Sequence, residues 1–428
     1  MGGGLAGLAA ARRVTGGGAT AVVLERAAEP GGRVRSERFA GCTIELGAVF
    51  VTPRYRRVRR LIAECGLEGR LERIPSFRTG VRRGGRWHAL DYRWPEVGLA
   101  AYSGLRLGEK LALARLVPSQ VRVLAAMRFF DMATAAAIDT RPLERVVGAG
   151  ANRYFASLLA EVFCNYPAGE VSLAFAALGA RFPTRRGWTL DGGLGALPRA
   201  LAERLDVRCG VAVERARATG DAVEVETSSG ERLVARAAIV ATRAHEALAI
   251  WPDATQNARE FLSEQSYSRG LGVFLRTSTP IQPTDRRGRP LYMRTLPRGE
   301  GGDALLAVVY LNDAAPDGGL ILLDAYAEAV DAADDDEELA ARLEAELAAV
   351  HPEAAELVTA RRVVRWDPFV PLFPAGRSRE LAKFRSTLQA GPVQLAGDYL
   401  HGPLMEGAVR AGEEAADRAL AHLSRAAT

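Results

Sequence analysis

The hydrophobic positions at the start of the chain predict a helix followed by a buried strand. Residues 8–14 are small or apolar apart from two arginines, and the glycines at 16–18 end that run. Residues 21–24 form a short continuous apolar run, which is typical of a strand buried in a parallel sheet. The first part of the chain therefore predicts an α/β fold class.

The middle and the second half predict other elements. Apolar positions spread over 104–130 predict two helices that Pro118 separates, and another helix is expected at about 151–164. The segments 269–277 and 304–311 have alternating or continuous apolar character and predict strands of a mixed sheet. The acidic run 334–338 suits a helix start, and that helix should run to Val350.

Composition limits the class of protein. At 428 residues and 48% hydrophobic content, the chain can bury a large core and should form two domains. No apolar run reaches the roughly 18 residues of a membrane-spanning helix. The cysteines at 42, 65, 164 and 209 show no paired spacing, which predicts free buried thiols in a reducing cytoplasm. The histidines form no metal-binding cluster, so no metal site is expected.

The charge balance adds little about partners. The net charge is +5, and nearly all basic residues are scattered arginines without interleaved aromatic residues, which argues against nucleic-acid binding. The densest basic run, 54–61, predicts a solvated helix with Val58, Leu61 and Ile62 facing inward. A site for an anionic lipid or substrate on this run is the less favoured alternative. A peripheral membrane contact of an otherwise cytoplasmic protein therefore stays open.

Three glycines at the start have the spacing of a dinucleotide-binding turn. Gly2, Gly4 and Gly7 match G-x-G-x-x-G, in which backbone N–H groups at a helix N-terminus hold a pyrophosphate. Glu25 follows the predicted strand about 20 residues later, where an acid binds ribose hydroxyls. A lone match is weak evidence, since this turn normally follows a strand and here none precedes it.

Two further segments support a nucleotide site. In the run 30–34, PGGRV, two glycines allow close approach of the backbone to a phosphate and the arginine pairs with it. The run 43–48, TIELGA, follows directly. In order, GGGLAGL, VVLER, PGGRV and IELGA resemble the N-terminus of the flavin amine oxidase superfamily. That group includes monoamine and polyamine oxidases, protoporphyrinogen oxidases and desaturases of the phytoene desaturase type.

Later segments carry the same resemblance. Residues 189–201 are similar to the family's glycine turn and helix, and residues 207–213 to its adenine-bordering strand. Residues 237–242 are similar to its return strand, and residues 393–399 together with 405–412 to its closing flavin motif. The resemblance touches both ends and the middle of the chain. It is poor across about 76–185 and 256–360.

The resemblance implies an α/β fold with a Rossmann-like, GR2-type FAD-binding domain and an α+β substrate domain of mixed sheet and helices. The FAD-binding domain would comprise 1–75, 189–255 and 386–428, and the substrate domain a helical part, 76–188, and a mixed-sheet part, 256–385. The FAD-binding domain would lack most of its first strand, which is central in this fold. We therefore expect the natural chain to begin several residues earlier with an apolar run, whose addition should raise flavin occupancy and stability.

The resemblance also implies which residues bind FAD. The expected cofactor-binding residues are Gly2, Gly4, Leu5, Ala6, Gly7, Glu25, Arg26, Gly32, Arg33, Gly47, Ala48, Val213, Trp366, Gly397, Asp398, Met405 and Ala408. In the family, the backbone at Val213 contacts adenine, Asp398 binds the ribityl or pyrophosphate region, and the helix from Met405 directs its positive end at the flavin. No cysteine follows Cys209, so the FAD is expected to be non-covalent.

The chain departs from the amine oxidases at two places. Leu404 stands where those enzymes place an aromatic residue before Met-Glu-Gly-Ala, and neither Lys110 nor Lys383 matches their lysine near flavin N5. The apolar Pro403-Leu404 pair favours a hydrophobic small-molecule substrate. We therefore expect dehydrogenation of a CH–CH or similarly activated bond, with hydride transfer to flavin N5 and reoxidation by O2 or a quinone.

Three alternatives remain at this point: an amine oxidase acting on a C–N bond, a redox-neutral isomerase or cyclase, and a non-catalytic binding protein similar to the Rab GDP-dissociation inhibitors. No catalytic residue is assigned. His401 lies between the flavin strand and its helix, which suggests the hypothesis that it faces the flavin ring, although a lone histidine in a loop is more often structural. Phe50 and Trp366 are expected to pack near the isoalloxazine. The sequence does not indicate an oligomeric state.

Overall fold

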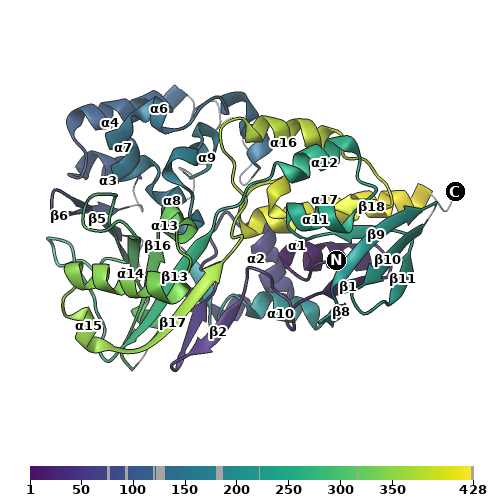
Figure 1. Cartoon of the computed structure of the whole chain (residues 1–428), viewed down its shortest axis with the longest axis horizontal. Coiled ribbons are helices and arrows are strands. Elements are labelled where there is room, and N and C mark those ends of the chain that lie inside the picture. Colours follow the sequence, from purple (N-terminus) through teal and green to yellow (C-terminus); the bar gives the residue numbers. More distant parts are fainter. Residues whose placement is uncertain are drawn as a thin grey trace.

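The molecule has two halves that lie side by side along its long axis (Figure 1). The computed structural model describes residues 1–74, 78–91, 95–118, 121, 131–179, 187–220, 222–315 and 317–425. One half is built on a seven-stranded sheet, and we call it the sheet half. The other contains α1 and α17, from opposite ends of the chain, and we call it the terminal half.

The terminal half is assembled from segments that are far apart in the sequence. Its elements are α1 (Leu5–Gly16), β1 (Val22–Glu25), β2 (Ser36–Phe39), β3 (Cys42–Glu45), α2 (Arg56–Glu64), α10 (Ala196–Ala202), β8 (Asp206–Cys209), β9 (Val213–Thr219), β10 (Ala222–Thr227), β11 (Arg232–Ala235), β12 (Ala238–Val240), α11 (Ala244–Ile250), α12 (Gln256–Ser263), β18 (Val393–Leu395) and α17 (Met405–Arg425). The apolar side chains of α1 pack against α17, where a Cβ at Gly412 would overlap the carbonyl oxygen of Ala6.

Two parallel strand pairs flank the first residues of the chain. β1 pairs with β8, and β12 pairs with β18. The Gly2 amide donates to Leu24 of β1 at 2.8 Å, and the Ala241 amide donates to Met1 at 2.8 Å. The first two residues therefore bridge the two strand pairs, at the position of the first strand in a Rossmann-like sheet. The predicted α/β fold class is confirmed.

The sheet half has the strand order β17-β13-β16-β15-β14-β5-β6. Its strands are β5 (Arg78–Arg83), β6 (Arg86–Asp91), β13 (Gly270–Thr277), β14 (Met293–Thr295), β15 (Leu305–Tyr310), β16 (Gly319–Ala325) and β17 (Val358–Trp366). Neighbours are antiparallel except β14 and β5, which are parallel. The strands predicted at 269–277 and 304–311 are β13 and β15, so this mixed sheet is confirmed.

The two faces of this sheet differ. Side chains of one face, among them Leu271, Val273, Ile321 and Leu323, pack against α14 (Asp336–Val350), and we call this the outer face. The opposite, inner face carries Phe274, which packs with residues of β3 in the terminal half. The sheet is therefore covered on one side by α14 and on the other by the terminal half and by α8 (Leu158–Cys164), whose Val162 packs with β14 and β15.

Helices complete the sheet half and the far edge of the molecule. They are α3 (Pro95–Ala101), α4 (Leu107–Leu113), α6 (Glu144–Val147), α7 (Ala149–Ala151), α8 (Leu158–Cys164), α9 (Leu173–Gly179), α13 (Ala327–Asp331), α14, α15 (Ala354–Leu357) and α16 (Arg377–Ser386). The remaining elements are the short strands β4 (Leu71–Arg73) and β7 (Trp188–Leu190) and the turns η1 (Glu68–Arg70), η2 (Ala114–Leu116), η3 (Met132–Ile138), η4 (Asn152–Ala156), η5 (Ala168–Glu170), η6 (Asn312–Ala314) and η7 (Asp398–Leu400).

Several helix predictions are confirmed and others need correction. α14 ends at Val350, and Asp335 caps it by accepting from two backbone amides of its first turn. The helix expected at about 151–164 is present, although its first part is a π-helical turn at Asn152–Ala156 and only Leu158–Cys164 is the α-helix α8. The first helix of the 104–130 segment is α4, which η2 extends, while most of the second lies outside the described residues.

The basic run at 54–61 forms α2, with Val58, Leu61 and Ile62 buried as expected. Its arginines are partly engaged, since Arg57 and Arg60 both form ion pairs with the buried Glu413 of α17. These two arginines therefore hold α2 against α17. A peripheral membrane contact through this basic run stays a prediction.

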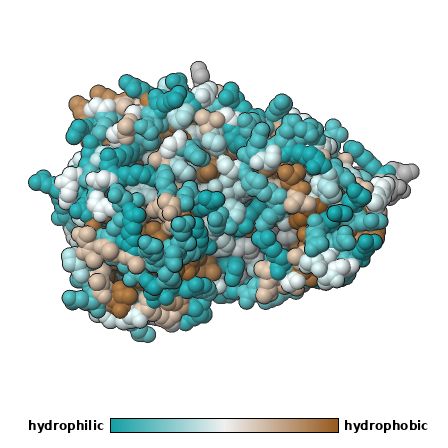
Figure 2. Space-filling view, in the orientation of Figure 1, coloured by the Kyte–Doolittle hydropathy of each residue, from teal (hydrophilic) through white to brown (hydrophobic). Residues whose placement is uncertain are grey.

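The surface is mostly hydrophilic on the face shown in Figure 2, with separate hydrophobic patches. One of these patches lies over α4, where Leu107 and Leu111 are 74% and 63% exposed. None of the helices in the described ranges is long and apolar enough to cross a membrane. Among the cysteines, three are buried and free as expected, but Cys209 at the end of β8 is exposed, so that part of the prediction is wrong.

Candidate cofactor site

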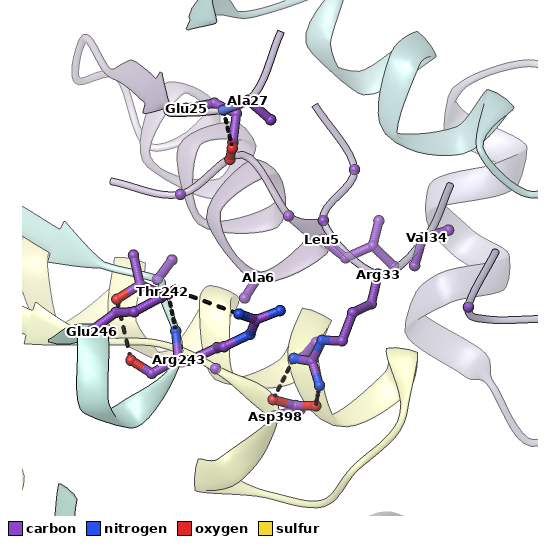
Figure 3. Close-up of a pocket in the computed structure, with 18 of the residues that line it drawn as sticks. Leu5, Ala6, Glu25, Ala27, Arg33, Val34, Thr242, Arg243, Glu246 and Asp398 are labelled. Carbon is purple, nitrogen blue, oxygen red and sulfur yellow. Dashed lines mark hydrogen bonds and ion pairs between the residues drawn. The ribbon is translucent and has the colours of Figure 1, made fainter. Parts of the chain in front are cut away.

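A cavity of about 660 Å³ lies in the terminal half and reaches the inner face of the sheet. This volume falls within the range of roughly 300–1,000 Å³ that is typical of ligand and cofactor sites. Its walls come from α1, β1, the 31–35 and 47–50 loops, β9, the 241–246 segment, β17 and the start of α17. Figure 3 shows its polar side chains converging from these separate segments.

The glycine turn forms one end of the cavity. Gly2 has a φ of +95°, which favours glycine, and Gly4 is the N-cap of α1. A Cβ at Gly4 would meet no atom within 4 Å, so the turn faces open space in front of the helix N-terminus. A Cβ at Gly7 would overlap the carbonyl oxygen of Gly2, so this glycine lets the helix approach its own turn. The turn therefore presents free backbone amides to the cavity.

Glu25 at the end of β1 holds the turn and faces the cavity. Its carboxylate accepts hydrogen bonds from the Gly3 amide at 2.5 Å and from the Ala27 amide at 2.8 Å. The bond to Ala27 is drawn in Figure 3. An acid in this place has oxygen lone pairs left to accept from ribose hydroxyls.

Arg33 and Asp398 join the two distant segments of the site. Two guanidinium nitrogens of Arg33 each lie 2.9 Å from a different carboxylate oxygen of Asp398, and one of them also donates to the Phe369 carbonyl at 2.7 Å. Burial acts against the charged guanidinium, but the charge and hydrogen bonds of Asp398 outweigh it and raise the pKa of Arg33. The pair fixes the loop after β1 to the end of β18 (Figure 3).

Sequence reasoning missed a second polar cluster. Arg243 and Glu246, at the start of α11, line the cavity and form an ion pair at 3.5 Å, and Arg26 pairs with Glu246 at 2.9 Å. Burial lowers the pKa of Arg243. The signal was the position of Arg243 directly after the predicted return strand 237–242, where a cation can approach a phosphate.

The wall towards the sheet half is apolar. Phe50 contacts Phe163 of α8 edge to face, with ring centroids 5.5 Å apart. Trp366, at the end of β17, donates its indole N–H to the Leu46 carbonyl and stacks near Phe369 at 6.2 Å. Leu404 closes the wall beside the start of α17. The site therefore combines a polar end at the glycine turn with an apolar end at the sheet.

The structure brings nearly all the predicted FAD-binding residues to this one cavity. Those that line it are Gly2, Gly4, Leu5, Ala6, Glu25, Arg26, Gly32, Arg33, Gly47, Ala48, Val213, Trp366, Gly397, Asp398, Met405 and Ala408. Gly7 does not line it and packs behind the turn instead. Phe50 lines it as well. Contact of these residues with FAD stays a prediction.

His401 lies elsewhere. It is 1% exposed, does not line the cavity, and sits 3.0 Å from Glu414 and 3.6 Å from Asp131. Burial by itself would raise the pKa of Asp131. The hydrogen bond and charge of His401, together with the charges of Arg385 and Arg410, outweigh burial and lower the pKa of Asp131. The hypothesis that His401 faces the flavin is therefore wrong, because its ring is turned into an ionic network behind α17.

We expect His401→Gln to leave the rate of flavin reduction within about twofold and to lower the melting temperature. The reason is that His401 hydrogen-bonds Glu414 and lies beside the buried carboxylate of Asp131, and leaving a buried polar group without its partner costs about 1–3 kcal/mol. Anaerobic stopped-flow spectroscopy measures the first quantity and thermal unfolding the second. A large loss of reduction rate in a variant of unchanged stability would contradict this assignment.

The cavity fits FAD in its chemistry. Backbone amides of the glycine turn suit the pyrophosphate, Glu25 suits the ribose, and the positive end of α17, at Met405, suits an electron-rich ring edge. Among the cavity-lining residues of the described chain, none is a cysteine or a histidine. The site therefore offers no side chain of the kind that forms a thioether or histidyl bond to flavin.

Comparison with known proteins agrees with this geometry. The model of the flavin-containing amine oxidoreductases matches residues 5–420, and the chain belongs to this family. It is an FAD-dependent oxidoreductase.

Similar solved structures show the shared fold. Putrescine oxidase bound to putrescine is 19% identical over 98% of both chains, with a TM-score of 0.79. A protein described as a protoporphyrinogen oxidase, from Exiguobacterium, is 18% identical over 99% of this chain and 98% of its own, with a TM-score of 0.76. A fatty acid isomerase from P. acnes that produces CLA is 15% identical over 98% and 97%, with a TM-score of 0.73.

Proposed function

We propose that this enzyme dehydrogenates a hydrophobic small molecule. The observation that carries the proposal is the apolar end of the cavity, where Phe50, Phe163, Trp366 and Leu404 meet beside the start of α17. When bound, FAD supplies a hydride acceptor at N5, and O2 or a quinone then takes up the two electrons. The substrate loses a hydride and a proton in this reaction.

The protein residues contribute position and exclusion of water. The edge-to-face Phe50–Phe163 pair and the fixed indole of Trp366 hold an apolar surface against the substrate, which removes water from the reacting carbon. The positive end of α17 favours negative charge developing near Met405. These features suit a CH–CH or similarly activated bond.

Oxidation of a C–N bond is the second candidate, and a specific observation favours it. Asp324 shares the inner face of the sheet with Leu320 and Leu322, outside the residues that line the cavity, and would offer a counter-charge to a cationic amine that extends along this face. A redox-neutral isomerisation is the third candidate, since an isomerase shares this fold.

The test is to purify the protein, record its visible spectrum, and mix it anaerobically with amines, porphyrinogens and polyenes. We expect an oxidised flavin spectrum and lasting bleaching by an apolar substrate. Bleaching by polyenes or porphyrinogens alone supports CH–CH oxidation, and bleaching by amines alone supports C–N oxidation. Conversion of substrate without lasting bleaching would overturn the proposal in favour of isomerisation.

A further inference from the structure

Arg243 lies beside the glycine turn. The Ala241 amide donates to the Met1 carbonyl at 2.8 Å, and a Cβ at Gly2 would lie 2.8 Å from the Ala241 carbonyl oxygen. The segment after β12 is therefore in backbone contact with the turn. Arg243 follows two residues later as the N-cap of α11, and it lines the cavity. In Figure 3 its side chain extends towards Ala6, in the first turn of α1.

The other arginine that faces this end of the cavity, Arg33, is already engaged within the protein. Its guanidinium makes two contacts of 2.9 Å with the Asp398 carboxylate and donates to the Phe369 carbonyl at 2.7 Å. A phosphate beside Arg33 would compete with these acceptors for the same nitrogens. It would also lie close to the negative charge of Asp398, which offsets much of the attraction. Arg33 is therefore poorly suited to be the main phosphate partner that the sequence predicts.

The guanidinium of Arg243, by contrast, lacks acceptors. No hydrogen bond joins it to a residue of the described ranges, and its ion pair with Glu246 is long at 3.5 Å. Glu246 has a closer partner in Arg26, at 2.9 Å. The side chain of Arg243 is only 21% exposed, and burial lowers its pKa, with the nearby charge of Arg33 acting in the same direction. A cation in this setting is costly unless an anion completes its hydrogen bonds.

The charges at this end of the cavity are unbalanced in favour of an anion. The ion pairs of Arg33 and of Arg26 balance their own charges, so the charge of Arg243 is left over. The helix α1 begins without a side-chain cap, so backbone amides of its first turn face the same space. Together they offer donors to a group with several anionic oxygens, as the pyrophosphate of a dinucleotide has.

We propose that Arg243 binds the pyrophosphate of FAD, while Arg33 ties the cavity walls together. The guanidinium of Arg243 donates to phosphate oxygens that the amides of the glycine turn also hold. Binding draws Arg243 away from Glu246, which keeps Arg26 as its partner. Arg243 is thus a cofactor-binding residue, and no bond is made or broken at it. This role does not depend on which substrate the enzyme oxidises.

The experiment uses the full chain freed of its flavin and a pair of matched ligands. ADP carries the adenine, the ribose and the pyrophosphate of FAD, and adenosine lacks only the phosphates. Isothermal titration calorimetry measures the binding of each ligand. The variants are Arg243→Gln, Arg243→Lys and Glu246→Gln, which keeps an oxygen for the Arg243 amide that donates to Glu246 at 3.2 Å. The matched control is Arg35→Gln, which removes an exposed arginine that also lines the cavity.

We expect Arg243→Gln to weaken ADP binding roughly tenfold to a hundredfold, the effect of a lost charged hydrogen bond, and to leave adenosine binding unchanged. Arg243→Lys should keep part of the ADP affinity, and Arg35→Gln should keep most of it. Glu246→Gln should tighten ADP binding, because a carboxylate that competes for Arg243 is removed. A purely structural role of Arg243 predicts no such gain.

Three results would each overturn the proposal. They are wild-type ADP affinity in Arg243→Gln, an equal loss of ADP and adenosine binding in that variant, and a loss in Arg35→Gln as large as in Arg243→Gln. Weaker ADP binding by Glu246→Gln would also contradict it. Because neither ligand contains flavin or is oxidised, the outcome is independent of the substrate screen, whose failure would affect only the proposed function.

Discussion

Replacing Arg33 by leucine is expected to give a protein that purifies with little or no flavin and unfolds at a markedly lower temperature. Asp398 is 5% exposed and relies on Arg33 as its ion-pair partner. Removing one partner of a buried pair leaves an uncompensated charge, at a cost of about 3–5 kcal/mol. The same change unties the loop after β1 from the end of β18, so the walls of the cavity lose their relative position.

The measurements are the ratio of flavin to protein absorbance after purification and the free energy of unfolding. Arg26→Leu is the matched control, because Arg26 also lines the cavity but its side chain is 62% exposed in its pair with Glu246. Such a pair contributes about 0–1 kcal/mol, so this control should unfold like the wild type. A stable Arg33→Leu protein with full flavin occupancy would show that the Arg33–Asp398 ion pair does not organise the site.

The Gly7→Ala substitution should have an effect of comparable size from a single methyl group. A Cβ at Gly7 would overlap the carbonyl oxygen of Gly2, which is backbone and cannot turn away as a side chain can. We expect a loss of about 3 kcal/mol, at the upper end of the usual cost of overpacking. The turn would also shift away from α1, and flavin occupancy should fall with it.

Gly16→Ala, at the other end of the same helix, is the control for Gly7→Ala. A Cβ at Gly16 would meet no atom within 4 Å, and a helical alanine is favoured over glycine by roughly 0.5–1 kcal/mol. This variant should unfold at the wild-type temperature or slightly above it. Chemical denaturation of the two proteins, with flavin absorbance read in parallel, decides between a steric effect at Gly7 and a general intolerance of α1 to alanine.

The polar end of the site could be predicted from the sequence because its geometry is local. The turn at Gly2–Gly7, the strand end at Glu25 and the loop at Arg33 each need particular residues at short spacing, since only glycine adopts the backbone or permits the approach. These segments lie at the cavity. The sheet strands were also recognisable, because 304–311 is a continuous apolar run and 269–277 has a short apolar run at its centre.

The apolar end could not be predicted, since it depends on contacts between distant segments. Phe163 reaches the cavity from α8, and the π-helical turn before that helix breaks the pattern on which its prediction rested. His401 is adjacent in sequence to the flavin motif, yet the turn after Asp398 directs it to Glu414. The parallel pairing of β14 with β5 joins segments about 200 residues apart.

One signal was present and unused. Asp324 interrupts an apolar strand, and an acid at a position that alternation assigns to an interior face marks either a buried ion pair or a ligand. The sequence alone could not choose between them, because the identity of its cross-strand neighbour, Gly272, depends on the register.

The cavity draws its walls from residues 1–50 and 397–408, and α1 packs along α17. During synthesis, the glycine turn therefore leaves the ribosome hundreds of residues before Asp398 and Met405 exist. Cofactor capture must then be a late, post-translational event that follows closure of the longest loop in the chain. Until then, the apolar side of α1 that packs against Ala415 and Ala416 of α17 has no partner in the nascent chain.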